Sequence, residues 1–210
     1  MNYTANTYYF DYENPVINNI TKDFKHLNSK QKIIESLYIK IRDNWRYTPF
    51  NIGLTKAHFK ASTIAKKTDG HCIDKAILYI TCLRAFNIPA RLHLAKVSNH
   101  IATERLEKII GTNELAPHGL VDVFYNKKWV KCSPAFNIEL CKLYNVDVLD
   151  FDGTNDAVLQ EYNKDDHKFM TYIEDYGHFE DVPFNFIKAT FQKNYPKLYE
   201  QFKDKTEMSL

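Results

Sequence analysis

Hydrophobic and polar positions along this chain follow a helical period first and a strand period later. Apolar residues recur every three or four positions from about Asn28 to Trp45, and Asn28 with Gln31 has the spacing of a capping box. The same period returns over Ile73–Leu83, and Pro89 limits that segment because proline cannot continue a helix. The pattern therefore predicts two amphipathic helices in the first half of the chain.

The middle of the chain changes to a strand pattern. Arg91–Val97 is rich in strand-forming residues at its end, and a longer alternating stretch covers His118–Tyr125. A further strand is expected at Trp129–Ser133, and Asn126-Lys127-Lys128 separates the two, where asparagine tolerates the positive φ of a hairpin turn. Helices followed by an antiparallel sheet predict an α+β fold.

The length of 210 residues fits a single domain, residues 1–210. Its core is expected at roughly 28–137, and a C-terminal extension with extra helices at roughly 138–210. Shorter helices are expected at Ser62–Lys67, Ala102–Ile110, Ile138–Tyr144 and Phe184–Asn194.

Composition narrows the class of protein. Hydrophobic residues make up 44% and charged residues 26%, which is ordinary globular usage. The formal charge of +2 is too balanced to predict nucleic acid as the main partner. No apolar run approaches the ~20 residues needed to span a bilayer, and Met1–Pro15 lacks the pattern of a signal peptide. We therefore expect a cytoplasmic protein without a membrane partner.

Among the four cysteines, Cys72 stands out by its position. The spacings of 10, 50 and 9 residues give neither a CxxC pair nor a zinc-finger pattern, so no metal, cofactor or disulfide framework is expected. Cys72 opens the second predicted helix, where unpaired N–H groups favour a thiolate. At 100° per residue, Cys72 lies about 76° around the helix axis from the centre of the apolar stripe of Ile73–Leu83. This places it at the edge of the buried face. We expect its pKa to lie below the ~8.5 of free cysteine.

Three stretches of sequence resemble one known family. They are residues 70–78 (GHCIDKAIL), 83–91 (LRAFNIPAR) and 118–134 (HGLVDVFYNKKWVKCSP). Their order and spacing are similar to those of the transglutaminase-like superfamily, whose members show G-x-C-x-(D/E)-x-A, then L-x-R-A-x-G-I-P-A-R, then a histidine-centred hairpin that ends in D-P. The resemblance covers roughly residues 58–137.

The resemblance implies a papain-like core, in which a central helix that starts with a cysteine packs on an antiparallel sheet that carries a histidine. Cys72 would attack an amide or peptide carbonyl and form a thioester, which passes to water or to an amine. His118 would accept the thiol proton and return it to the leaving amine. This interpretation makes the chain a cysteine peptidase, an amidase or a transglutaminase-like acyltransferase.

One catalytic position departs from the family pattern. Family members usually carry an aspartate before the proline that closes the hairpin, and here that residue is Ser133. In the hairpin register, with Phe124 facing Trp129, Ser133 is a diagonal neighbour of His118, ~7–8 Å away by backbone. Its hydroxyl either orients the imidazole weakly or only satisfies the backbone at the strand end.

Two other residues are candidates to orient His118. Asn137 would form a Cys-His-Asn site, although its position also suits the N-cap of the next helix. Asp122 shares the His118 face, but the register places it opposite Lys131, which favours a solvated ion pair. For the oxyanion, the backbone N–H of Cys72 is the expected donor, with Trp45 or Tyr47 as side-chain alternatives.

The remaining histidines carry no ligand spacing. His71 is expected to be a loop residue, and His93 is expected on a solvated face of the sheet beside Arg91. The site residues that the sequence predicts are therefore Cys72, His118, Ser133 and Asn137, without a cofactor and with a peptide or amide substrate. The alternative is a weak or inactive member that uses the fold as a binding module, because Ser133 replaces the acid.

Overall fold

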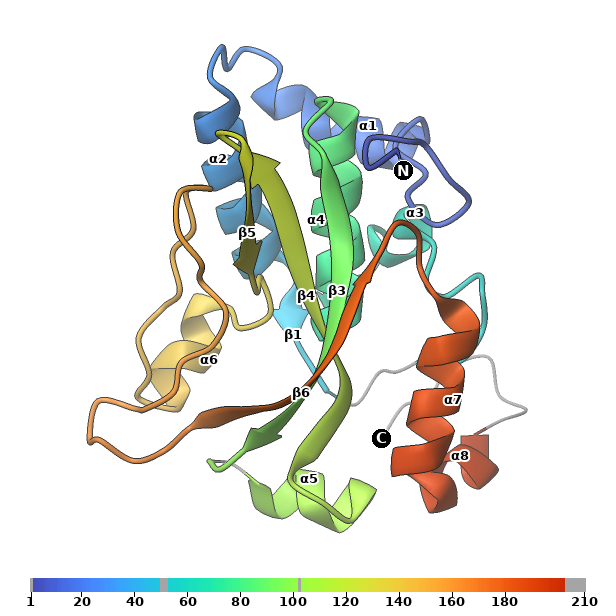
Figure 1. Ribbon diagram of the computed structural model, residues 1–210, viewed down its shortest axis with the longest axis vertical. Coiled ribbons are helices and arrows are strands. Elements are labelled where there is room, and N and C mark those ends of the chain that lie inside the picture. Colours follow the sequence, from blue (N-terminus) through green and yellow to red (C-terminus); the bar gives the residue numbers. More distant parts are fainter. Residues whose placement is uncertain (1, 50–52, 102, 203–210) are drawn as a thin grey trace.

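A four-stranded antiparallel sheet in the order β5-β4-β3-β6 organises the molecule (Figure 1). The computed structural model describes residues 2–49, 53–101 and 103–202. The strands are β3 (Ala90–Asn99), β4 (Glu114–Tyr125), β5 (Lys128–Cys132) and β6 (Met170–Phe179). Helices and strands therefore mix as predicted, and the fold class is α+β.

The β4–β5 hairpin has the predicted register. Phe124 pairs with Trp129 and Asp122 with Lys131. The turn residues Asn126 and Lys127 have φ values of 48° and 63°, so both adopt the left-handed conformation of a two-residue hairpin loop. This register places His118 and Asp122 on the same face of β4.

Helix α4 (Cys72–Ala85) lies at the centre of the molecule, and every side chain from Cys72 to Arg84 is buried. It packs against β3 and β4 on one side and against α2 (Lys30–Asn44) on the other. The start of α2 differs from the prediction, because the N-cap is Ser29 and not Asn28. The Ser29 hydroxyl oxygen accepts the backbone N–H of Lys32. Helix α2 therefore begins one residue later than predicted.

Short elements hold the start of α4 in place. The parallel strands β1 (Arg46–Tyr47) and β2 (Asp69–Gly70) pair directly, with Tyr47 opposite Gly70. This pairing fixes the chain two residues before Cys72. The other short elements are α1 (Pro15–Thr21), η1 (Lys22–Phe24), α3 (Ala61–Ile64), α5 (Thr103–Ile110) and α6 (Ile138–Leu143).

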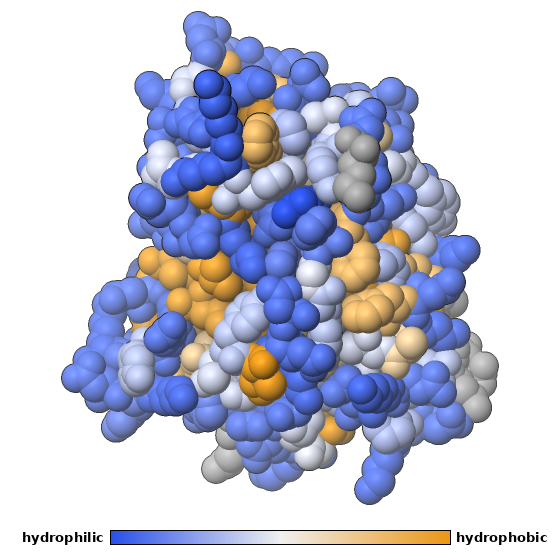
Figure 2. All heavy atoms as spheres, in the orientation of Figure 1, coloured by the Kyte–Doolittle hydropathy of each residue, from blue (hydrophilic) through white to orange (hydrophobic). Residues whose placement is uncertain are grey.

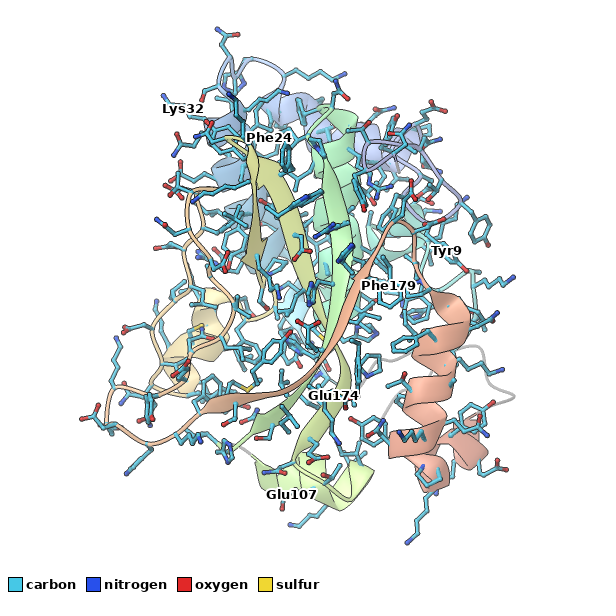
Figure 3. The ribbon with its side chains drawn as sticks, viewed as in Figure 1. Tyr9, Phe24, Lys32, Glu107, Glu174 and Phe179 are labelled. Atoms are coloured by element: carbon cyan, nitrogen blue, oxygen red, sulfur yellow. The ribbon has the colours of Figure 1, made fainter. Side chains whose placement is uncertain are left out.

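The C-terminal part of the chain adds a strand to the sheet and two helices beside it. β6 pairs with the free edge of β3, with two register shifts. Helices α7 (Phe184–Asn194) and α8 (Pro196–Phe202) follow. Figure 3 shows Glu174 and Phe179 along β6, and the Phe179 and Phe186 rings, 5.4 Å apart between centroids, join β6 to α7. β6 and α8 were not predicted from the sequence.

The face of the molecule seen in Figure 2 is hydrophilic along its middle and apolar on either side. Buried apolar residues from Tyr9 to Ile187 form one continuous cluster. A smaller cluster lies between α7, α8 and Leu54. Within the described residues, none of the helices combines the length and apolarity that crossing a bilayer requires.

Candidate active site at Cys72 and His118

His71 caps the helix that carries Cys72. Its Nδ1 accepts the backbone N–H groups of Ile73 at 3.0 Å and Asp74 at 3.2 Å. Burial, above all, lowers the pKa of His71 to about 4, so the ring is neutral near pH 7. His71 lies outside the helix, as expected of a loop residue, but its capping role was not predicted. His71 satisfies two helix-terminal donors and so defines where α4 begins.

Cys72 lies at the first position of α4, and its sulfur faces the backbone N–H groups of Gly119 and Ile73. Burial raises its pKa to about 11, and these N–H groups offset only part of that effect. The expected thiolate was therefore wrong, because the loss of hydration outweighs the helix start. With 7% of its surface exposed, Cys72 is a thiol at neutral pH.

The other three cysteines are free thiols that lie deeper in the core. Burial raises the pKa of Cys82 to about 12 and also raises the pKa values of Cys132 and Cys141. Of the four, only Cys72 borders the apolar pocket described next.

An apolar pocket opens beside Cys72. Its walls come from the β1 region, the start of α4, the start of β4 and the C-terminal helices. Its volume is about 50 Å³, and nearly all of its lining is apolar. The lining includes Tyr47, Phe59, Leu115, Ile187, Phe191 and Tyr195. A substrate group that enters it would lie against the Cys72 sulfur.

His118 lies on β4 next to Gly119, the residue whose backbone faces the Cys72 sulfur. Burial lowers its pKa to about 4, and the positive charge that His71 can acquire contributes further. Neither ring nitrogen has a hydrogen-bond partner within the described part of the chain. At neutral pH, Cys72 is therefore a neutral thiol and His118 a neutral imidazole.

Ser133 and His118 line a common cavity of about 10 Å³, the size of a single water site. The Ser133 carbonyl accepts the Tyr38 hydroxyl at 2.8 Å, and its N–H donates to Ala157 at 2.9 Å. Direct hydrogen bonding to His118 is absent among the described residues. The segment after β5 covers the cavity, which leaves His118 only 1% exposed.

Asn137 does not orient His118 in this structure. Its Oδ1 accepts the Tyr47 N–H at 3.0 Å, and its Nδ2 donates to Glu139 at 2.6 Å. It occupies the N-cap position of α6, although its side chain makes no capping hydrogen bond. Asn137 therefore connects Tyr47, in the pocket wall, to the start of α6. Its side chain makes no hydrogen bond with the imidazole.

Asp122 is buried, and its carboxylate forms an ion pair with Arg91. Lys131 is its partner only in the backbone register of the hairpin. Its carboxylate accepts Arg91 Nε at 2.8 Å and also contacts His93 Nδ1 at 3.3 Å. Lys131 instead lies 3.7 Å from Asp175. The solvated ion pair and the solvated His93 expected from the sequence were therefore wrong, because β6 and neighbouring side chains enclose this part of the sheet.

The two side-chain candidates for oxyanion binding differ in position. Tyr47 borders the pocket together with Cys72. Trp45 is buried, and its indole Nε1 has no partner among the described residues. The backbone N–H of Gly119, which faces the sulfur, adds a donor that the sequence did not reveal, whereas the Ile73 N–H is already donated to His71.

A second polar cluster, formed by His58, His71 and Asp74, lies beneath the pocket floor. All three side chains are buried, and their ligand atoms lie within 4.8 Å of one another. However, His71 Nδ1 accepts two N–H groups, so Nε2 carries the proton and offers no lone pair to a cation. His58 Nε2 contacts Asp74 at 3.1 Å and its Nδ1 contacts Lys67 at 3.3 Å. Asp74 is therefore hydrogen-bonded to His58, whereas His71 Nε2 lies 3.6 Å from it, and the neighbouring His71 and His58 lower the pKa of the Asp74 carboxyl against the effect of burial.

Sequence reasoning missed the C-terminal wall of the pocket. Ile187, Phe191 and Tyr195 line it from α7 and the residue that follows α7. Their spacing of four residues is the available signal, since it places all three side chains on one side of a helix. The missing information was which part of the core that side faces.

Comparisons with known proteins agree with this geometry. Residues 18–134, just over half of the chain, match the model of the transglutaminase-like superfamily. The structure is similar to "a Putative Cysteine Protease from Cytophaga hutchinsonii", with a TM-score of 0.50 and 16% sequence identity. The alignment covers 88% of this chain and 48% of that one, so this chain spans about half of its length. The comparison with curated proteins gave no match. Because the family match extends over both the cysteine helix and the histidine hairpin, the chain belongs to the transglutaminase-like superfamily.

Proposed function

We propose that this protein is an enzyme that catalyses cysteine-dependent acyl transfer on an amide or peptide substrate, with Cys72 as nucleophile and His118 as general base. One observation carries the proposal: the Cys72 sulfur borders a pocket at a helix start, and the Gly119 backbone beside His118 faces it. A covalent nucleophile needs access to substrate and N–H donors beside it, and it also needs a base, a role that we assign to His118 because it is the chain neighbour of Gly119.

The neutral state of both groups determines the mechanism. As the sulfur attacks the carbonyl carbon, the thiol proton passes to His118, and the oxyanion accepts backbone N–H groups at the start of α4. Collapse breaks the C–N bond, and His118 returns the proton to the leaving amine. Water or an amine then cleaves the thioester. Catalytic hydrogen bonds often tighten only when substrate binds, so contact between Cys72 and His118 belongs to the bound state.

The alternative function is that of a binding module. The observation in its favour is that His118 is sealed from solvent and lacks an orienting acid, since Ser133 stands in place of the aspartate. Under this alternative, the pocket binds a ligand without forming a thioester. The two functions differ in whether Cys72 becomes acylated.

The test is acylation of Cys72 by an activated ester such as p-nitrophenyl acetate, followed by release of p-nitrophenol and by mass spectrometry of the Cys72 peptide. We expect an acyl group on Cys72, no burst in Cys72→Ser, and a rate ~10²–10⁴-fold lower in His118→Ala. Cys141→Ser is the matched control and should react like wild type. A folded protein whose Cys72 remains unmodified would instead support the binding module.

A cytoplasmic location is part of the same proposal. A reducing compartment keeps Cys72 a free thiol, as the mechanism requires. Fractionation of cells that produce the native protein tests the location, and recovery of the protein in an oxidising compartment would contradict it.

A further inference from the structure

We infer that the pocket beside Cys72 is an acyl-binding subsite that selects a short, branched aliphatic group, about the size of a valine or leucine side chain. The inference rests on the proposed function, because it concerns the group whose carbonyl Cys72 attacks. It adds the chemical class of that group and the residues that select it.

Few polar atoms face the pocket, because nearly all of its lining is apolar. The Tyr195 hydroxyl donates to the Glu114 carbonyl at 2.8 Å and accepts the Ala116 N–H at 2.7 Å, so the residue presents its ring to the pocket. His71 uses Nδ1 to cap α4, and its buried Nε2 lies 3.6 Å from the Asp74 carboxylate. A carboxylate or carboxamide that entered would lose its hydration and would find few partners in exchange, which is unfavourable.

The apolar walls give an aliphatic group a favourable environment. Phe59, Leu115, Ile187 and Phe191 surround the space on several sides, and each contributes only carbon atoms. Contact with such walls is favourable in proportion to the apolar area removed from water. The pocket therefore distinguishes acyl groups by polarity.

The size of the pocket sets an upper limit on the group. A volume of about 50 Å³ has room for roughly four groups of the size of a water or a methyl, since one such site needs ~10–15 Å³. An isobutyl group fills this space. A longer chain or an aromatic ring requires α7 to move away from β4.

The selecting wall belongs to this chain rather than to the family core. Ile187, Phe191 and Tyr195 lie beyond residue 134, where the family match ends. The Tyr195 hydroxyl accepts a hydrogen bond from the N–H of Ala116, two residues before His118. Helix α7 and Tyr195 thus line the pocket together with the first part of β4, the strand that carries the base, and Figure 1 shows α7 beside the sheet.

The experiment compares p-nitrophenyl isovalerate, p-nitrophenyl acetate and p-nitrophenyl hemisuccinate. In each reaction an S–C bond forms at Cys72, the C–O bond to p-nitrophenol breaks, and the thiol proton passes to His118. The second-order rate constant for acylation is divided by that of N-acetylcysteine, to correct for the intrinsic reactivity of each ester. We expect isovalerate to exceed acetate by at least about tenfold, and hemisuccinate to fall at least about tenfold below acetate. Equal normalised rates for the three esters would overturn the subsite while leaving the proposed function intact.

Two variants locate the selectivity in the pocket. Ile187→Ala enlarges it and should shift the preference several-fold from isovalerate toward p-nitrophenyl hexanoate. Leu198→Ala is the matched control, because Leu198 packs in the same C-terminal cluster but does not line the pocket. Its selectivity should equal that of wild type. If both variants changed the selectivity equally, the pocket would not be its source.

A protection assay separates failure of the subsite from failure of the proposed function. If none of the esters acylates Cys72, iodoacetamide labelling of Cys72 is measured with isovaleramide or succinamate present. Stronger protection by isovaleramide supports the apolar subsite even in a protein that does no chemistry. Equal protection, or none, overturns it.

Discussion

Gly119 lies so close to the first turn of α4 that a Cβ atom built on it would come within 2.7 Å of the Ile73 Cα. Its other near neighbours include the Ile73 backbone nitrogen, at 2.9 Å. The contact sets the distance between the strand that carries His118 and the helix that carries Cys72. Only glycine permits this approach, because two of the three nearest atoms belong to the Ile73 backbone and cannot rotate away.

Gly119→Ala should therefore force β4 away from α4. We expect a loss of unfolding free energy of ~1–3 kcal/mol, as for overpacking in a core, and slower acylation of Cys72. Chemical denaturation and the p-nitrophenyl acetate reaction measure the two effects. The double variant Gly119→Ala/Ile73→Ala should show no rescue, because trimming the Ile73 side chain leaves its backbone in place. Recovery in the double variant would contradict a backbone clash.

Ser133 gives a second prediction, about the missing acid. Ser133→Asp places a carboxylate in the cavity that Ser133 shares with His118, and this charge should raise the pKa of the imidazole from about 4. The imidazolium then favours a thiolate at Cys72. We expect faster alkylation of Cys72 by iodoacetamide at pH 7 than in wild type, where burial holds the thiol pKa at about 11.

Ser133→Asn is the control for size without charge, and it should leave the pH dependence of Cys72 alkylation unchanged. The measurement is the alkylation rate of Cys72, mapped by mass spectrometry, between pH 5 and 10. In wild type the rate should keep rising with pH across this range. If Ser133→Asp and Ser133→Asn gave the same profile, Ser133 would not neighbour His118 in the way that the shared cavity indicates.

A third prediction concerns Asn137. It tests whether this residue supports the pocket wall at Tyr47 or orients the imidazole of His118. Asn137→Ala removes the acceptor of the Tyr47 N–H, and an unsatisfied buried donor costs ~1–3 kcal/mol of stability. Since Asn137 makes no contact with His118, the shape of the pH profile of Cys72 alkylation should remain that of wild type. Asn155→Ala, at an exposed site, is the control for stability. A shifted pH profile would restore Asn137 as an orienting residue.

The sequence predicted the features that depend on neighbouring residues. The start of α4 at Cys72 and the hairpin turn at Asn126-Lys127 follow from capping and turn chemistry, and the structure confirms both. β6 escaped prediction because it is an edge strand with a largely exposed, polar pattern, held by backbone pairing to a strand about 80 residues away. Alternation of apolar residues cannot reveal such a strand.

In the candidate site, too, some features depend on neighbouring residues and others depend on contacts between distant parts of the chain. The N-cap position of Asn137 is local, but its hydrogen bond to Tyr47, 90 residues away, is a property of the folded chain. For Cys72, the helix start favours a thiolate, whereas the burial that raises its pKa comes from packing against β4 and the C-terminal helices. For Cys72 tertiary structure reverses the prediction made from the local sequence, whereas for Asn137 it adds a distant partner to the N-cap position that was predicted.

The last prediction concerns stability in acid. Burial lowers the pKa values of His71 and His118 to about 4, whereas an unfolded chain has ~6.5 for histidine. Between these values the unfolded state binds more protons than the folded state, so stability is complete above pH ~6.5 and is lost as the pH falls toward 4. Each histidine accounts for at most ~3 kcal/mol of this loss. Asp74 acts in a separate pH range, since its lowered pKa affects stability only below its ordinary value of 3.8.

Denaturant unfolding measures the difference in unfolding free energy between pH 7 and pH 5. This difference should be smaller in His118→Gln than in wild type, and it should be unchanged in the exposed control His26→Gln. Equal acid sensitivity in all three proteins would mean that the His118 ring becomes hydrated or protonated without unfolding, and that the cavity beside Ser133 opens in the native state.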